Sequence, residues 1–191
     1  MRRPVEDDVE GLLPLFDAEV VRYLDGHVPD AHDMWRAVAA WVGHWELRGY
    51  GITTWIEKAT GIIVGRGGLW YPGGWPQLEV GWTVGRAWWG RGYAREAGAA
   101  ALALAWAHLD PPWVCSVIHP DNVRSQAVAR ALGAVRPPEP QVLRGQPVDG
   151  RAHQFAGAAV VGREVQFGAV AGGQQRRLGP LVRADTLAKT M

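Results

Sequence analysis

Gly90 and Gly92, followed by Arg95, form the segment of this chain best suited to binding an anion. Residues 78–84 ahead of them are β-branched and aromatic, which predicts a strand. Residues 94–108 are rich in alanine and leucine, which predicts a helix. A glycine-bearing turn between a strand and a helix aims several backbone N–H groups at one point, and the helix N-terminus adds about half a positive charge. The segment therefore predicts a phosphate-binding loop.

Two common phosphate-binding loops do not fit this segment. A dinucleotide-binding fingerprint needs a third glycine, and that position is Arg95. A Walker loop ends in Gly-Lys-Ser or Gly-Lys-Thr, and the sequence has no such triplet. A phosphate-binding loop of another class is therefore expected.

A second group of polar residues follows a second predicted strand. Residues 112–118 form this strand and lead into Asn122, with Ser125 three positions and Gly133 eleven positions further on. Asp121 or Asn122 also suits the N-cap of a helix, and Gly133 suits the residue just after its end. A capping role and a ligand-binding role are compatible for these residues.

The two motifs together resemble the GNAT acetyltransferases over roughly residues 2 to 150. The pyrophosphate loop of that family reads Gln/Arg-x-x-Gly-x-Gly/Ala, and residues 89–94 read Trp-Gly-Arg-Gly-Tyr-Ala. Tryptophan at the first position is familiar in the branch that acetylates protein N-terminal amines. The family's Asn, small residue and Gly match Asn122, Ser125 and Gly133, and residues 118–122 resemble the RimJ/RimL-like branch. The resemblance implies an α/β (α+β) fold, with a twisted mixed β-sheet flanked by helices.

The resemblance also implies a cofactor and a reaction. The co-substrate is acetyl-CoA, and its acetyl group moves to a primary amine by direct attack through a tetrahedral intermediate. The acceptor is a protein N-terminal α-amine or a small amine. The residues implied to hold the pyrophosphate are Trp89 as the first loop residue, the amides of Arg91, Gly92, Tyr93 and Ala94, and Arg95.

The strand ahead of the loop is implied to bind the acetyl and pantetheine groups. In the family this strand carries a bulge, expected here at Trp82 to Val84, whose free backbone groups make these bonds. Val84 lies five residues before Trp89, where the family has its pantetheine contact. Asn122 is implied to bond the pantetheine or a bridging water.

Glu79, three residues before Trp82, is the candidate general base, and the alternative is a carboxylate that faces solvent or pairs with an arginine. An α-amine titrates near 8 and a lysine near 10.4, so a weak base suits an N-terminal amine better. Many family members have a tyrosine acid seven residues after the Asn, and that position is Ala129 here. Ser125 is then the nearest candidate acid, and the alternative is a hydroxyl that only contacts coenzyme A.

Composition limits the other function classes. The 191 residues suit one domain, and a net charge of +1 gives no field for capturing nucleic acid or a membrane. The single cysteine, Cys115, excludes an internal disulfide, suits a reducing cytoplasm and is expected to be a structural thiol. The six histidines lack metal-ligand spacing, and no apolar run or leader segment is evident. We expect a cytoplasmic monomer or homodimer without a metal site.

The remaining elements follow from pattern. Helices are predicted over residues 6–15 and 31–48, and a hairpin over 49–57 and 61–71 with its turn at 58–60. The family's first strand has only three residues ahead of Pro4 in which to form, so this strand is expected to be missing.

Aromatic residues form two groups in the sequence. The first recurs at helical spacing and is expected to be core; its members are Trp35, Trp41 and Trp45. The second lies beside a Gly-Pro loop and either lines a pocket or packs in the core; its members are Trp70, Tyr71 and Trp75.

The end of the chain departs from the family. Residues 142–148 resemble its closing hairpin, so the acetyltransferase domain is placed at 1–152. Residues 153–191 are an atypical tail whose composition favours poor order, with one further strand conceivable around 158–170 and an altered reading frame near 150 as a hypothesis.

Three function classes are therefore open. The first is an active acetyl-CoA-dependent N-acetyltransferase. The second is a non-catalytic acyl-CoA-binding module, which the alanine at position 129 favours. The third is an interaction protein that keeps the fold without the ligand.

Overall fold

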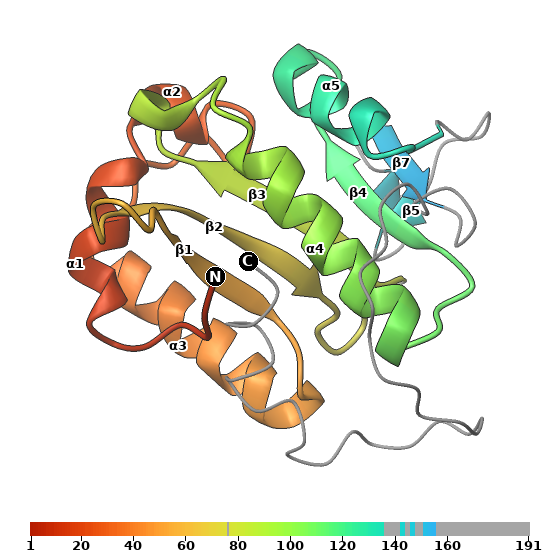
Figure 1. The fold of residues 1–191 in the computed structure, drawn as a ribbon, viewed down its shortest axis with the longest axis horizontal. Helices are drawn as coiled ribbons and strands as arrows, with labels where there is room; N and C mark the ends of the chain where they lie inside the picture. Colours follow the sequence, from red (N-terminus) through yellow and green to blue (C-terminus); the bar gives the residue numbers. More distant parts are fainter. Residues whose placement is uncertain (76, 136–141, 144–145, 148–150, 156–191) are drawn as a thin grey trace.

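The computed structural model describes residues 1–75, 77–135, 142–143, 146–147 and 151–155. Their main feature is a five-stranded mixed sheet in the order β1-β2-β3-β4-β7 (Figure 1). The pairs β1–β2, β2–β3 and β4–β7 are antiparallel, and β3–β4 is parallel. The strands are β1 (Ile52–Ile56), β2 (Ile63–Trp70), β3 (Glu79–Val84), β4 (Val114–Ile118) and β7 (Arg151–Phe155).

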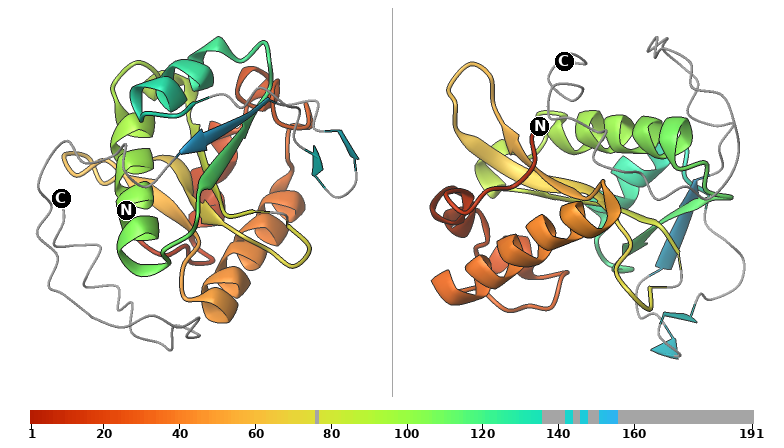
Figure 2. Two further views of the ribbon diagram at one scale, coloured as in Figure 1. Left: turned by 90° about the vertical axis from the view of Figure 1, so that its right-hand side faces the viewer. Right: turned by 90° about the horizontal axis from the view of Figure 1, so that it is seen from below.

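Helices cover both faces of this sheet, with α4 on one face and α1 and α3 on the other (Figure 2). The α4 face holds a core of Val80, Leu102 and Val114, among others, and the opposite face a core around Leu12, Val38 and Ile52. This arrangement confirms the predicted α/β fold. The helices are α1 (Asp8–Leu12), α2 (Ala18–Val21), α3 (Ala31–Arg48), α4 (Tyr93–His108) and α5 (Val123–Ala131), with 3-10 turns η1 (Leu13–Leu15) and η2 (Arg86–Trp88).

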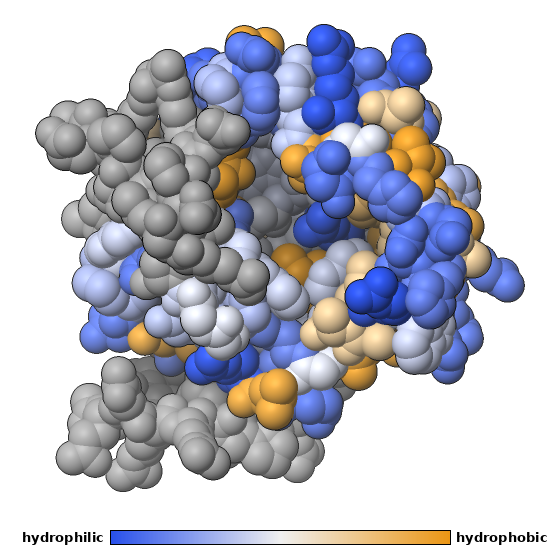
Figure 3. Space-filling model, turned by 180° about the vertical axis from the view of Figure 1, so that it is seen from behind, coloured by the Kyte–Doolittle hydropathy of each residue, from blue (hydrophilic) through white to orange (hydrophobic). Residues whose placement is uncertain are grey.

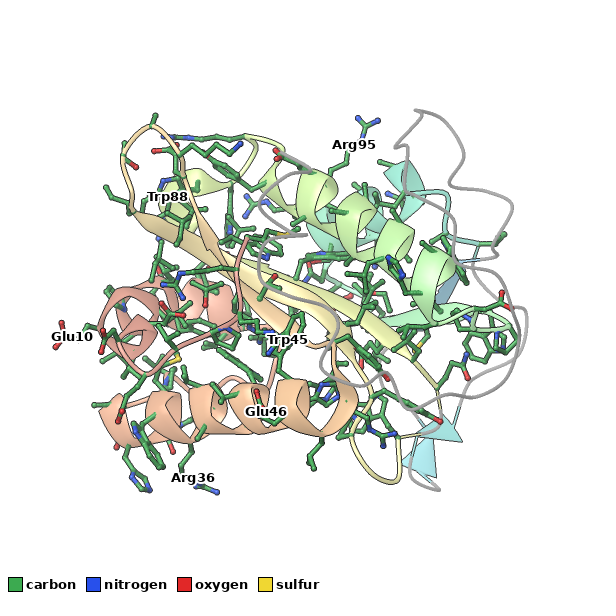
Figure 4. The ribbon with its side chains drawn as sticks, turned by 60° about the horizontal axis from the view of Figure 1, so that its bottom comes forward. Glu10, Arg36, Trp45, Glu46, Trp88 and Arg95 are labelled. Atoms are coloured by element: carbon green, nitrogen blue, oxygen red, sulfur yellow. The ribbon has the colours of Figure 1, made fainter. Side chains whose placement is uncertain are left out.

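Helix α3 begins and ends as its sequence predicts. Asp30 and Asp33 form a reciprocal capping box at its start, and Gly49 ends it in the left-handed conformation at φ 76°. Trp45 is buried and points from α3 toward the sheet (Figure 4). Trp35 is 47% exposed and donates its indole N–H to Glu6, so the core prediction is wrong for this member of the stripe.

The β3–α4–β4 crossover leaves a gap in the sheet. Strand β3 pairs with β2 in unbroken register from Glu79 to Val84, so the bulge predicted at Trp82 to Val84 is wrong. Among the described residues, β3 and β4 pair only at Glu79 and Cys115. Because the strands separate beyond this pair, the backbone groups of β3 that point toward β4 are freed without a bulge.

The first residues of the chain contact the outer edge of β1. Arg2 and Thr54 exchange two backbone hydrogen bonds of 3.1 and 3.0 Å, so a single bridge takes the place of the family's first strand, which was predicted to be missing. Asp8 is fully buried beside this bridge and accepts hydrogen bonds from the guanidinium of Arg2, the hydroxyl of Thr54 and the backbone N–H of Val5. One carboxylate thus fastens the first residues to α1 and β1.

Two elements follow the α5 region. Strands β5 (Val142–Leu143) and β6 (Gln146–Pro147) pair antiparallel where the closing hairpin was predicted. Strand β7 pairs with β4 from Arg151 to Phe155, and it crosses the domain boundary placed at residue 152. The strand considered around residues 158–170, and the tail beyond residue 155, lie outside the described residues.

Asp8→Ala is expected to lower the free energy of unfolding by about 3 kcal/mol, because it leaves Thr54 and the partly buried Arg2 without their acceptor. Denaturant unfolding followed by tryptophan fluorescence measures the change. The control is Asp7→Ala, which removes an exposed carboxylate that makes no capping bond and is expected to change stability by less than about 0.5 kcal/mol. Equal effects of the two substitutions would contradict the role of Asp8.

Candidate active site

A cavity of about 1150 Å³ opens where β3 and β4 separate. Its wall is formed by α2 and the turn after it, by β2 and β3, by the loop before α4, and by the residues that follow β4. Figure 3, which shows the face opposite α4, has a hollow near its middle, bordered by both hydrophilic and hydrophobic residues. The sequence-predicted site residues on its wall are Glu79, Trp82, Val84, Trp89, Gly92, Tyr93, Ala94, Arg95, Asn122 and Ser125.

The N-terminus of α4 supplies a set of backbone donors to this cavity. Gly90 and Gly92 have φ of 77° and 89°, a region that favours glycine. The carbonyl of Gly92 accepts the first intrahelical hydrogen bond, from Glu96, so the N–H groups of residues 93–95 have no acceptor within the helix. A Cβ at either glycine would meet nothing within 4 Å. A ligand can therefore approach this backbone closely, as an anion-binding turn requires.

Two side chains near the start of α4 interact with Glu57, the residue that follows β1. Arg91 does not line the cavity; its guanidinium lies 3.9 Å from Glu57. The hydroxyl of Tyr93 donates to the same carboxylate. The contribution of these two residues to the anion-binding turn is therefore limited to their backbone.

Arginines at the cavity rim carry its positive charge. Arg95 extends from the first turn of α4 into solvent (Figure 4). Arg124 lies with its guanidinium 4.5 Å from the ring centroid of Trp89, and both residues line the cavity. Sequence reasoning missed Arg124, although it stands between Asn122 and Ser125 in the second motif.

Two tryptophan indoles link β3 to the loop before α4 and to the start of α5. Trp89 donates to the carbonyl of Val84 at 2.7 Å, so this oxygen of the predicted pantetheine-contact residue already has a partner. Trp82 donates to the hydroxyl oxygen of Ser125 at 3.3 Å. The side-chain oxygen of Asn122 accepts from the backbone N–H of Ser125 at 3.1 Å, which confirms its capping role.

Glu79 lies at the point where the strands part. The N–H of Cys115 donates to the carbonyl of Leu78, and the N–H of Val117, two residues further along β4, donates to Glu79 Oε1 at 3.4 Å. Trp75 donates to Oε2 at 3.0 Å. Burial raises the pKa of Glu79, and these two hydrogen bonds and the charge of Arg66 oppose the rise. The carboxylate faces the cavity in a position to accept a proton.

Arg66 is a second charged residue that sequence reasoning missed. It stands in the middle of the predominantly apolar strand β2, which is the signal that could have revealed it. Its guanidinium carbon lies 5.2 Å from the ring of Trp41 and 5.7 Å from that of Phe16. Burial lowers the pKa of Arg66 to about 10, against the opposing effect of Glu79.

The aromatic group of Trp70, Tyr71 and Trp75 lies partly in the cavity wall and partly in the core. Trp70 and Trp75 line the cavity, and Trp70 stacks on His44 with ring centroids 4.6 Å apart. Tyr71 packs against the core of the α4 face instead. Ala129, at the position of the family's tyrosine, is fully buried in that core.

The sequence of the first 135 residues decides the family. The profile described as "Acetyltransferase (GNAT) domain" matches residues 1–135, which is more than half of the chain. This chain belongs to the GNAT acetyltransferases. A curated relative, the uncharacterized protein YkkB of Bacillus subtilis (strain 168), is 32% identical over 129 residues, or 61% of this chain and 69% of YkkB.

Solved GNAT structures share the fold. An acetyltransferase from Agrobacterium tumefaciens str. C58 has a TM-score of 0.70 at 25% identity, covering 81% of this chain and 88% of its own. RimL, a ribosomal L7/L12 alpha-N-protein acetyltransferase in complex with coenzyme A, has a TM-score of 0.65 at 18% identity, covering 81% and 92%. A ribosomal-protein-S5-alanine acetyltransferase from Vibrio fischeri has a TM-score of 0.62 at 15% identity, covering 82% and 92%.

Two other findings concern this GNAT domain. Within the described ranges, no cluster of three or more His, Cys, Asp or Glu residues is placed to hold a metal ion. None of the helices in the described part of the chain combines the length and apolar character that crossing a membrane requires.

The single cysteine of this GNAT domain is expected to resist alkylation. Cys115 is buried in β4, and burial raises the pKa of its thiol to about 12, so about one thiol in ten thousand is ionised at pH 8. Iodoacetamide at pH 8 should label less than a tenth of the native protein in the time that labels all of a guanidinium-unfolded control. Stoichiometric labelling of the native protein would contradict the inert role.

Proposed function

We propose that this GNAT domain transfers an acetyl group from acetyl-CoA to a primary amine. The observation that carries the proposal is that one cavity joins the backbone donors at the start of α4 to the Glu79 carboxylate in the strand gap. The first feature suits a pyrophosphate, and the second suits proton removal from an amine. An acyl donor and an acceptor can thus meet within a single space.

The residues at the start of α4 fit coenzyme A. Open space lies over Gly90 and Gly92, the N–H groups of residues 93–95 face an anion, and Arg95 and Arg124 add positive charge. The unpaired edge of β3 offers backbone hydrogen-bonding groups to the pantetheine arm of coenzyme A, which is extended and contains amides. The coenzyme A in the RimL complex, a relative with the same fold, supports this assignment.

The bound thioester supplies an activated acetyl group, and the chain orients it and moves protons. The freed backbone N–H of Trp82 is our candidate donor to the acetyl carbonyl, an interaction worth roughly 3–4 kcal/mol in comparable enzymes. Glu79 accepts the proton of the attacking amine. Ser125 still has a hydroxyl proton to donate to the leaving thiolate, which needs little help because its pKa is near 8.5.

The acceptor we favour is an α-amine. Its pKa near 8 leaves it partly neutral at physiological pH, whereas a lysine near 10.4 demands a stronger base than Glu79. RimL, a ribosomal L7/L12 alpha-N-protein acetyltransferase, and the ribosomal-protein-S5-alanine acetyltransferase from Vibrio fischeri support the same class. The second candidate function, a non-catalytic acyl-CoA-binding module, is favoured by the buried alanine at position 129. Turnover of any amine excludes it.

Gly92→Val is expected to weaken coenzyme A binding at least tenfold, because the added side chain fills the space over the anion-binding turn and strains a left-handed residue. Isothermal titration with coenzyme A measures the affinity. The matched control is Gly61→Val, which introduces the same backbone strain at φ 72° and lies outside the cavity wall. Unchanged affinity in the Gly92 variant would remove the loop from the proposed site.

Glu79→Gln is expected to lower kcat by about 10²- to 10⁴-fold and to leave coenzyme A affinity within twofold, because a neutral amide accepts no proton. Burial raises the pKa of Glu79 above its ordinary 4.5, so activity should rise with pH along a limb above 4.5, and the Gln variant should lose this limb. Initial rates from pH 5 to 9 test both points.

Glu10→Gln is the control for Glu79, because Glu10 is exposed and points away from the protein (Figure 4). Its rates should equal those of the wild type at every pH. A Glu79→Gln enzyme with the wild-type pH profile would exclude Glu79 as the base.

A further inference from the structure

The face of the β2–β3 pair opposite α4 carries a row of three cross-strand pairs. Side chains alternate between the two faces of a strand, so directly paired residues two apart share one face. On this face the outer pairs carry the charged side chains and the middle pair is two glycines. The pairs are Arg66–Thr83, Gly68–Gly81 and Trp70–Glu79.

The middle pair leaves a trough between the two charges. A Cβ placed on Gly81 would meet nothing within 4 Å, and Gly81 lines the cavity. Arg66 and Glu79 line the same cavity at either end of this gap. Four residues along a strand span about 13 Å between backbone positions, and the two long side chains shorten the distance between the charges. The trough thus has room for a small molecule.

The guanidinium of Arg66 has no anionic partner within the described residues. Its Nε is buried and makes no hydrogen bond there, and none of the ion pairs formed by those residues includes it. Its known contacts are the ring faces of Trp41 and Phe16, which hold the side chain in place from the side of α3 and η1. A partly buried cation without an anionic partner is costly, and an anion entering the cavity would offset that cost.

We propose that the acceptor is a primary amine that also carries a carboxylate, with its amine at Glu79 and its carboxylate on the guanidinium of Arg66. This inference rests on the proposed acetyl transfer and names the acceptor class. The planar fork of an arginine binds a carboxylate through two parallel hydrogen bonds, and the opposite charges at the two ends of the trough match a zwitterion. Trp70 and Trp75 form the wall at the Glu79 end and contact the carbon skeleton.

Two sources supply this chemistry, a free amino acid and a peptide whose first residue is acidic. The first test pair is L-methionine against L-methioninamide. The second is the tripeptide Asp-Ala-Ala-amide against Asn-Ala-Ala-amide. The wild-type enzyme is expected to prefer the carboxylate in one pair, and that pair identifies the source.

Arg66→Met is expected to reduce this preference, measured as a ratio of kcat/KM values, about 10- to 100-fold. Comparing the same ratio in wild type and variant cancels the difference in amine pKa within each pair. Arg66→Lys keeps a cation without the fork and should lose part of the preference. The Lys variant also tests the proposal if the Met variant does not fold. Arg36→Met, on an exposed arginine of α3 that points away from the protein, should leave the ratio unchanged (Figure 4).

Four results would overturn the proposal. Unchanged kcat/KM ratios in both Arg66 variants would show that the arginine does not bind the carboxylate of the acceptor. Loss of coenzyme A affinity in folded Arg66 variants would assign the arginine to the donor instead. Absence of acetylation of all four probes, with coenzyme A bound, would reject the proposed acetyl transfer together with this inference. Turnover of L-methioninamide or Asn-Ala-Ala-amide alone, the probes without the carboxylate, would reject the acceptor class but not the proposed acetyl transfer.

Discussion

The separation of β3 from β4 is the constraint on which the rest of the site depends. These neighbouring strands pair at Glu79 and Cys115 and then diverge, although each keeps a full ladder with its other neighbour. Backbone groups that a closed sheet would satisfy are thereby directed at a cavity. Glu79 partly fills this role itself, because its carboxylate accepts the N–H of Val117. The residue that we propose as the base thus also accepts a backbone hydrogen bond at the edge of the gap.

The charged groups of the cavity come from different parts of the fold. The positive end of α4 and the arginines near it lie at one end of the cavity, and Arg66 lies on the sheet face that α1 and α3 cover. Glu79 lines the same cavity and interacts electrostatically with Arg66. Its pKa is raised by burial and restrained by the two hydrogen bonds and by Arg66. A raised pKa makes this carboxylate a stronger base than an exposed one.

Local features of this site were readable from sequence, and features set by tertiary packing were not. The glycine turn before α4 and the cap at Asn122 depend on neighbouring residues, and both stand where the sequence places them. The divergence of β3 from β4 depends on how a crossover helix packs, so the expected bulge was wrong. Arg66 was overlooked because its surroundings depend on Trp41 and Phe16, which come from segments distant in the sequence.

The bond from the indole of Trp89 to the carbonyl of Val84 has a consequence for the loop before α4. It links the first residue of the loop to the end of β3 through a side chain with few rotatable bonds, and Arg124 covers the same ring. The loop is therefore ordered as the protein folds, and little conformational entropy remains to be lost when a ligand arrives. The rigid position of this tryptophan preorganises the loop for its ligand, so that the loop does not need to rearrange on binding.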